Sequence, residues 1–310
     1  MNQPDPAIIL HHYPMSPYSE KVRAMFGYLG TQWQSAMSTE MPPRPTLAAL
    51  AGGYRKIPVA QVGADIYCDT QTITTLLANH CDKPELALEN CEAAIQEFVK
   101  KVEGEIFFAC VMYGAGMKLN KKVLRSMSIW HVVKFLFDRI KMGKQAVVKM
   151  PSPKRAPAIV EAYIPEVEAM LASDFLFGNT PTIADFSAYH SLWFARDMGE
   201  KPIFKDYPKV SEWMDRIKSF GHGVRTEISG EQAIATARTA SPIAVPENAR
   251  AHDLIGELVQ VAPNDYALDP SSGVLEGCTE LTYILSRESP KAGKVHVHFP
   301  RRGYQLIKSN

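Results

Sequence analysis

The first eighty residues alternate short apolar runs with helical patterns, and this order restricts the folds open to the chain. The segments expected to be strands are residues 7–12, 31–36, 57–62 and 65–68. The segments expected to be helices are residues 17–29, 46–51 and 69–79. The predicted order is therefore β-α-β-α-β-β-α, which indicates an α/β domain over residues 1–80.

The rest of the chain changes character twice. Residues 86–240 are predicted to form an all-helical domain, with helices near 95–110, 122–149, 157–172, 184–198 and 208–220. A proline-containing linker follows at 241–250. We then expect a small antiparallel β extension over 250–310, with strands near 256–262, 279–286, 294–300 and 304–308.

Composition excludes several classes of protein. Apolar residues make up 46% of the 310 residues and charged residues 22%, the balance of a globular protein. The net charge of +1 lacks the basic excess that nucleic-acid binding needs, so no nucleic-acid partner is expected. The five cysteines show no paired spacing, which argues against a disulfide framework and favours a reducing, cytoplasmic setting. We see no secretory signal and no run long enough to span a bilayer, and we expect no membrane partner.

Three short features in the first eighty residues carry the chemistry. Ser16-Pro17-Tyr18-Ser19 lies where a strand becomes a helix, so Ser16 can cap the helix and Pro17 suits its first turn. Arg55-Lys56-Ile57-Pro58-Val59 leads into a strand, and Asp69-Thr70 opens the next helix. Each feature alone is typical of ordinary capping or strand-start chemistry, but their order and spacing together favour a binding site.

These features resemble the cytosolic glutathione transferases over roughly the first 220 residues. Ser16-Pro17-Tyr18-Ser19 resembles the Cys-Pro-Tyr-Cys of glutaredoxins with both cysteines replaced, which implies a thioredoxin-like domain. Ile57-Pro58-Val59 resembles the family's segment with a cis proline. The resemblance extends to Thr182-Ile183-Ala184-Asp185, a capping box of the family's helical domain. This motif also predicts a helix start without the resemblance, because Thr182 can cap the helix while Asp185 reaches back to the N–H of the capping residue.

The resemblance implies a role for each site residue. Ser16 would stabilise the glutathione thiolate, Val59 would bind the tripeptide backbone after a cis Ile57-Pro58 bond, and Asp69 and Thr70 would hold its γ-glutamyl end. Arg55 or Lys56 would meet the glycyl carboxylate, and we take Lys56 as the site residue. Glutathione is the expected co-substrate and no metal is expected. His296 and His298 share a strand face, but the pattern supplies no third ligand.

The sequence leaves alternatives open both for the residue that activates the thiol and for the function. Ser19 or Tyr13 could activate the thiol in place of Ser16. The favoured function is transfer of glutathione to a small apolar electrophile in detoxification by a homodimer. The alternatives are a non-catalytic protein that uses the same fold for binding or interaction, and a glutathione-dependent peroxidase or dehalogenase.

Overall fold

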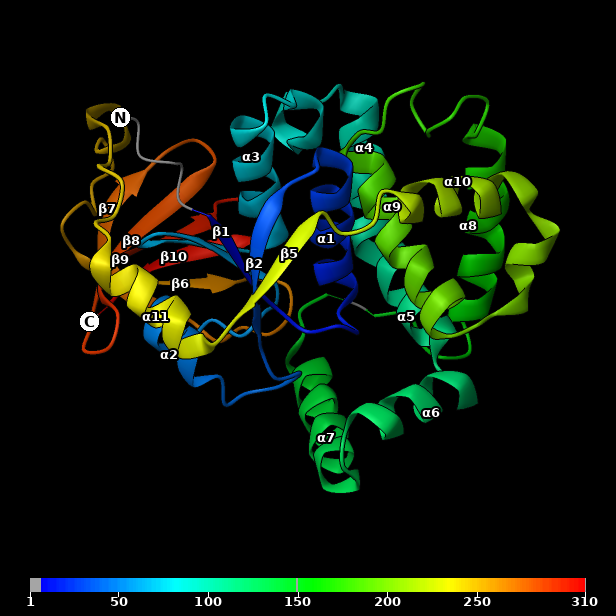
Figure 1. Ribbon diagram of the computed structural model, residues 1–310, viewed down its shortest axis with the longest axis horizontal. Helices are drawn as coiled ribbons and strands as arrows, with labels where there is room; N and C mark the ends of the chain where they lie inside the picture. Colours follow the sequence, from blue (N-terminus) through cyan, green and yellow to red (C-terminus); the bar gives the residue numbers. More distant parts are fainter. Residues whose placement is uncertain (1–6, 149, 310) are drawn as a thin grey trace.

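The computed structural model describes residues 7–148 and 150–309 (Figure 1). These residues form a ten-stranded sheet in the order β10-β6-β7-β8-β9-β4-β3-β1-β2-β5. The strands are β1 (Ile8–His12), β2 (Gln32–Met37), β3 (Val59–Val62), β4 (Asp65–Cys68), β5 (Val224–Ile228), β6 (Leu258–Pro263), β7 (Ser271–Cys278), β8 (Thr282–Ser289), β9 (Gly293–Pro300) and β10 (Tyr304–Lys308).

Helices cover both faces of the sheet near its centre and build a separate bundle beside it (Figure 1). The α-helices are α1 (Pro17–Leu29), α2 (Pro45–Ala51), α3 (Thr70–His80), α4 (Ala93–Lys101), α5 (Phe107–Gly114), α6 (Met117–Ser126), α7 (Ile129–Gln145), α8 (Ala156–Met170), α9 (Ile183–Trp193), α10 (Pro208–Ser219) and α11 (Gly230–Thr239). Two π-helical turns, η3 (Val102–Ile106) and η4 (Phe194–Met198), continue α4 and α9. The 3₁₀ turns are η1 (Pro84–Leu86), η2 (Leu88–Asn90), η5 (Pro202–Asp206) and η6 (Glu247–Ala249).

The first domain has the predicted β-α-β-α-β-β-α order. Strand β1 is buried on both faces: Ile8 and Leu10 pack toward α1, and Ile9 packs toward α11. Helix α1 begins at Pro17 and ends at Gly30, whose left-handed φ of 62° suits a residue without a side chain. Because β1 and β2 are parallel while β3 and β4 are antiparallel, the centre of the sheet has thioredoxin-like topology.

The helical domain packs on the α1 side of the sheet through one continuous apolar core. Its central helix, α9, begins with the predicted capping box: Thr182 accepts a hydrogen bond from the Ala184 N–H, and Asp185 accepts one from the Thr182 N–H at 2.9 Å. Asp185 is fully buried and also accepts hydrogen bonds from the Leu176 N–H and the Trp213 indole. The helix start is thereby tied to two neighbouring segments.

The tail is a continuation of the sheet rather than a separate layer. Strand β9 pairs in parallel with β4, and β8, β7, β6 and β10 follow outward from it. The strands at 258–263, 282–289, 293–300 and 304–308 match the expected β extension, and β7 is an additional strand. Val295, Val297 and Phe299 alternate onto one face and share a core with Leu47 and Leu50 of α2.

The chain returns to the first domain before the tail begins. Residues 224–228, expected within the all-helical range 86–240, instead form the edge strand β5 parallel to β2. Its burial pattern is almost entirely exposed, so it lacks the apolar alternation that marks a strand in sequence. Helix α11 then packs on α2 and β9.

The helix expected over 122–149 is instead a hairpin of two helices, α6 and α7. Ser128 caps α7 by accepting a hydrogen bond from the His131 N–H, which explains the break. The hairpin projects away from both domains at the bottom of Figure 1.

No helix among the described residues is both long and apolar enough to cross a membrane. The same residues contain no group of three or more histidine, cysteine, aspartate or glutamate side chains placed to hold a metal ion.

Candidate active site

The start of α1 presents two serine hydroxyls. Ser16 is the N-cap, and its Oγ accepts a hydrogen bond of 3.2 Å from the Ser19 N–H. The Ser16 hydroxyl proton remains available as a donor, and the side chain lies at the positive end of the helix. The Ser19 Oγ is buried and has no hydrogen-bond partner among the described residues. The Ser16 hydroxyl therefore lies where an anionic sulfur could be stabilised, whereas Ser19 is completely buried.

Tyr18 lies between these serines in sequence and points into the interface with the helical domain. The centroid of its ring lies 4.5 Å from the ring centroid of Phe107 and 5.0 Å from that of His190. Burial raises the pKa of Tyr18 well above its usual value and lowers the pKa of His190 to about 4. Both side chains are therefore neutral near pH 7, and this side of the site is apolar.

The second feature of the site is the Ile57-Pro58-Val59 segment, which lies beside the end of β1. The Ile57–Pro58 peptide bond is cis. Val59 is fully buried and begins β3, in register with His11 of β1 and Cys68 of β4. The backbone of this segment is thus held at the centre of the sheet, next to the end of β4 from which Asp69 follows.

Asp69 caps α3 and has an unusual backbone conformation, with a φ of 80°. One carboxylate oxygen accepts a hydrogen bond of 3.0 Å from the Gln71 N–H. The other accepts one of 2.8 Å from the hydroxyl of Tyr304, on the tail strand β10. Thr70, the first residue of α3, is buried beside it.

The two candidate cations are both paired. Lys56 binds both carboxylate oxygens of Asp265 at 2.7 and 2.9 Å, and its Nζ lies 4.3 Å from the ring centroid of Tyr266. Arg55 binds both oxygens of Asp138 on α7 at 2.6 and 2.8 Å. The structure thus places Lys56 beside the tail and Arg55 beside the α6–α7 hairpin.

Comparison with known proteins identifies the family of the two domains. The family model of the glutathione S-transferase N-terminal domain matches residues 10–85, and that of the C-terminal domain matches residues 154–216. The crystal structure of a GST-like protein from Pseudomonas syringae has 32% sequence identity and a TM-score of 0.78, over 98% of this chain and 99% of that chain. The chain belongs to the glutathione S-transferase family.

Other solved structures are more distant. A glutathione S-transferase from Rhodospirillum rubrum F11 is 20% identical over 68% of this chain and 88% of that chain, with a TM-score of 0.44. A glutathione transferase family member from Pseudomonas fluorescens, crystallised with two glutathione molecules bound, is 14% identical over 71% of this chain and 91% of that chain, with a TM-score of 0.48. No curated protein matches the sequence.

In this member of the family the tail reaches the site from outside the two family domains. Asp265 and Tyr266 lie in the loop between β6 and β7, and Tyr304 begins β10. The ring of Tyr266 meets that of Phe108 edge-on, with the two ring centroids 5.6 Å apart. Sequence reasoning missed these three residues. The only local signal is an acidic and aromatic loop between two strand patterns, and such a loop does not indicate what it covers.

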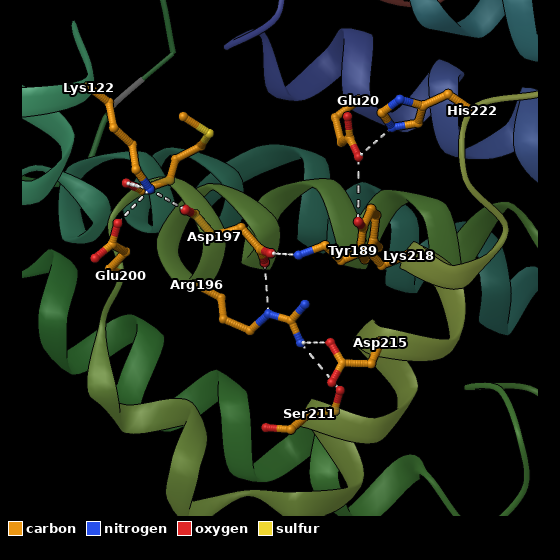
Figure 2. Close-up of polar contacts among 11 residues, drawn as sticks. Glu20, Lys122, Tyr189, Arg196, Asp197, Glu200, Ser211, Asp215, Lys218 and His222 are labelled. Carbon is orange, nitrogen blue, oxygen red and sulfur yellow. Dashed lines mark hydrogen bonds and ion pairs between the residues drawn. The ribbon is translucent and has the colours of Figure 1, made fainter. Parts of the chain in front are cut away.

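A buried polar network holds α1 against the helical domain (Figure 2). Glu20 accepts hydrogen bonds from Arg23 and from the Nε2 of His222 at 3.1 Å, and Tyr189 lies within 3.5 Å of it. Burial by itself would raise the pKa of Glu20, but the hydrogen bond from His222 and the charge of Arg23 outweigh it and lower that pKa. The ionised Glu20 therefore helps to fix the helix whose N-terminus carries Ser16.

A cavity of about 220 Å³ opens on the α3 side of the site. Its lining includes Gln71 and Thr72 from the first turn of α3, Glu103 from η3, and Leu281 and Arg302 from the tail. It therefore borders the Asp69 end of the site.

Proposed function

We propose that this chain binds glutathione at the N-terminus of α1 and transfers it, through a new bond from its sulfur, to a small apolar electrophile. Family membership supports the coarser statement, a glutathione-binding, transferase-like function. The observation that carries the finer proposal is the convergence of three features: the Ser16 hydroxyl at one helix N-terminus, Asp69 and Thr70 at another, and the buried Pro58-Val59 segment.

In this proposal Ser16 stabilises the thiolate. A free thiol with a pKa of about 8.5 is only a few per cent ionised at neutral pH. Lowering that pKa by about two units requires roughly 2.7 kcal/mol of differential stabilisation. One charge-assisted hydrogen bond supplies about 1.5–3 kcal/mol, and the helix N-terminus adds up to about 1 kcal/mol. The hydroxyl and the helix together are sufficient, without a basic side chain.

The rest of the tripeptide would be bound by charged and polar side chains and by the backbone of the protein. Asp69 would pair with the γ-glutamyl ammonium group, while the Thr70 hydroxyl and the first N–H groups of α3 would hold its carboxylate. The backbone of Val59 would bind the cysteinyl unit, and Lys56 would bind the glycyl carboxylate. The electrophile would lie against the apolar side formed by Phe107 and Phe108 of α5.

The tail must release two of these anchors for glutathione to bind. Asp265 holds Lys56 with a carboxylate, and Tyr304 donates a hydrogen bond to Asp69. Each contact resembles one that the tripeptide would make, because a carboxylate meets Lys56 and a donor meets Asp69. The same observation favours a second candidate function, a non-catalytic protein in which the tail occupies the site.

The test is conjugation of glutathione to a chloro-dinitrobenzene, together with calorimetric binding of glutathione. Ser16→Ala should lower kcat/KM by roughly 10- to 100-fold, the equivalent of about 1.5–3 kcal/mol. Because it also removes the N-cap of α1, it should lower the free energy of unfolding by about 0.5–2 kcal/mol while the protein stays folded. Ser219→Ala, an exposed serine at the end of α10, is the matched control. Ser19→Ala and Tyr13→Phe distinguish the other candidate hydroxyls.

The outcomes separate the candidate functions. Glutathione binding without turnover supports the non-catalytic protein, and no detectable binding contradicts both. Turnover of a hydroperoxide or a halogenated substrate in place of the chloro-dinitrobenzene would assign the peroxidase or dehalogenase reaction. The homodimer, the cytoplasmic location and the role in detoxification remain proposals, and gel filtration tests the first.

A further inference from the structure

The α6–α7 hairpin stands apart from the rest of the molecule. None of the described residues of α6 or α7 is buried, although both helices are rich in apolar side chains. In Figure 1 the hairpin extends below the sheet and the helical bundle. Its apolar residues therefore do not contribute to the core that holds the two domains together.

One face of each helix fixes the hairpin to the protein. On α7, Asp138 binds Arg55, and Arg139 donates a hydrogen bond of 2.7 Å to the Glu40 carbonyl. On α6, Lys122 binds Glu200 at 2.8 Å and donates to the carbonyls of Asp197 and Met198 (Figure 2). These contacts determine which way each helix is turned.

The opposite face of α7 is an apolar stripe, which we call the outer stripe. Its members recur at helical spacing and all are exposed: Ile129, Trp130, Val133, Leu136, Phe137 and Ile140. Trp130 is 77% exposed and Phe137 69%. Met117 and Leu124 are exposed in the same way on α6. Such a continuous set of large apolar side chains indicates an interaction surface.

The hairpin is also strongly basic. Residues 117–148 contain eight lysines and arginines and a single acidic residue, Asp138, in a chain whose net charge is only +1. Within the described part of the chain, no acidic side chain lies within 4.0 Å of the basic groups of Lys121, Arg125, Lys134, Lys141 and Lys144. On α7, Lys134 and Lys141 follow one edge of the outer stripe at helical spacing, and Lys144 lies one turn beyond Ile140 at the end of the stripe.

The basic residues and the outer stripe of the hairpin together indicate which kind of partner it binds. Nucleic acid would satisfy the cations but would leave the outer stripe in water. A second copy of the chain would cover the stripe but would bring two strongly basic surfaces together. A bilayer that contains anionic lipid satisfies both, because acyl chains accept the apolar residues while lipid headgroups neutralise the lysines.

We propose that the α6–α7 hairpin docks this protein on anionic membrane surfaces. Trp130 and Phe137 enter the interface, and Lys134, Lys141 and Lys144 contact the headgroups. The hairpin lies in the plane of the membrane and does not cross it. The earlier expectation of no membrane partner was based on the lack of a spanning segment, and surface binding needs none.

Vesicle co-sedimentation of the full chain tests the proposal. Vesicles of phosphatidylcholine with about one third phosphatidylglycerol should bind at least tenfold more tightly than vesicles of phosphatidylcholine alone, and added salt should weaken binding. Trp130→Ser with Phe137→Ser should weaken binding at least about tenfold. The triple variant Lys134→Gln, Lys141→Gln and Lys144→Gln should remove most of the preference for anionic lipid.

A matched control and an optical signal keep the test specific. Lys100, Lys205 and Lys209 are exposed lysines outside the hairpin, and their replacement by glutamine should leave binding unchanged. Because Trp33, Trp193 and Trp213 are buried, a blue shift in tryptophan emission on adding anionic vesicles reports Trp130. Absence of binding to anionic vesicles would overturn the proposal. So would dimerisation that disappears in the Trp130 and Phe137 variant, which would make the outer stripe a subunit interface.

Discussion

The tail and the α6–α7 hairpin both lie outside the two matched family domains, yet they relate to the protein in opposite ways. The tail adds five strands to the central sheet, buries Phe299 and Leu285 completely, and reaches the candidate active site. The hairpin touches the protein mainly through polar contacts and leaves Trp130 and Phe137 exposed. The tail is therefore part of the folded unit, and the hairpin is a surface directed outward.

The difference shows that an apolar pattern in a sequence does not by itself identify core residues. Both regions carry such a pattern, with period two in the tail and helical period in the hairpin. In the tail, neighbouring strands and α2 cover the apolar face. In the hairpin, no described element covers it, and lysines lie along one edge of it.

The largest expected effect compares one phenylalanine from each region. Phe299→Ala removes a fully buried ring and should lower the free energy of unfolding by about 3–5 kcal/mol. Phe137→Ala removes an exposed ring and should change that free energy by less than about 0.5 kcal/mol. Urea unfolding of both variants measures the two values. Similar losses would mean that the outer stripe is packed in solution.

The second effect is a loss of stability at acid pH, and it comes from histidines that are buried in the first domain and in the helical domain. Burial lowers the pKa of His11 to about 4, of His12 to about 3 and of His190 to about 4, from a usual value of 6.5. Because the unfolded chain binds these protons first, the stabilisation is complete above pH 6.5 and is lost as the pH falls toward the folded pKa values. The loss is about 2 kcal/mol for each histidine by pH 5.

Urea unfolding at several pH values measures this loss. The variant with Trp130→Ser and Phe137→Ser should follow the same pH curve as the parent, because neither residue lies in the histidine-containing core. A flat curve for the parent between pH 6.5 and 5 would show that these histidines are not buried as neutral groups.

The third prediction tests whether the tail competes with glutathione for Lys56. Asp265→Asn removes the carboxylate that holds Lys56 and should therefore tighten glutathione binding by roughly three- to tenfold. Calorimetry measures the affinity. Asp253→Asn, an exposed acidic residue in the chain before β6, is the control. Weaker binding in Asp265→Asn would mean that Asp265 belongs to the glutathione site instead of competing for it.

The smallest effect concerns the attachment of the hairpin. Asp138→Asn removes the ion pair with Arg55 and should change global stability by less than about 1 kcal/mol. The α7 amides should nevertheless exchange faster, because this pair is one of the few contacts that hold the helix. Hydrogen exchange measured by mass spectrometry tests this. Unchanged exchange in α7 would show that other contacts are sufficient.

Sequence reasoning was most successful where the decisive contacts are local. The strand and helix order of the first domain follows from periodicity, and the Thr182 capping box needs only residues three apart. The cis Ile57–Pro58 bond was expected from the family resemblance. The strands β5 and β7 were missed because one is exposed and the other is rich in glycine and serine.

The sequence by itself determined the order of elements in the first domain, the helix N-termini that carry Ser16 and Asp69, and the family. Only the tertiary structure decided that Tyr304 and Asp265 meet Asp69 and Lys56, which lie 235 and 209 residues away in the chain. It also decided which of two apolar patterns is covered. The physical reason is that capping and periodicity act over a few residues, whereas burial and ion pairing depend on which distant segments the fold brings together.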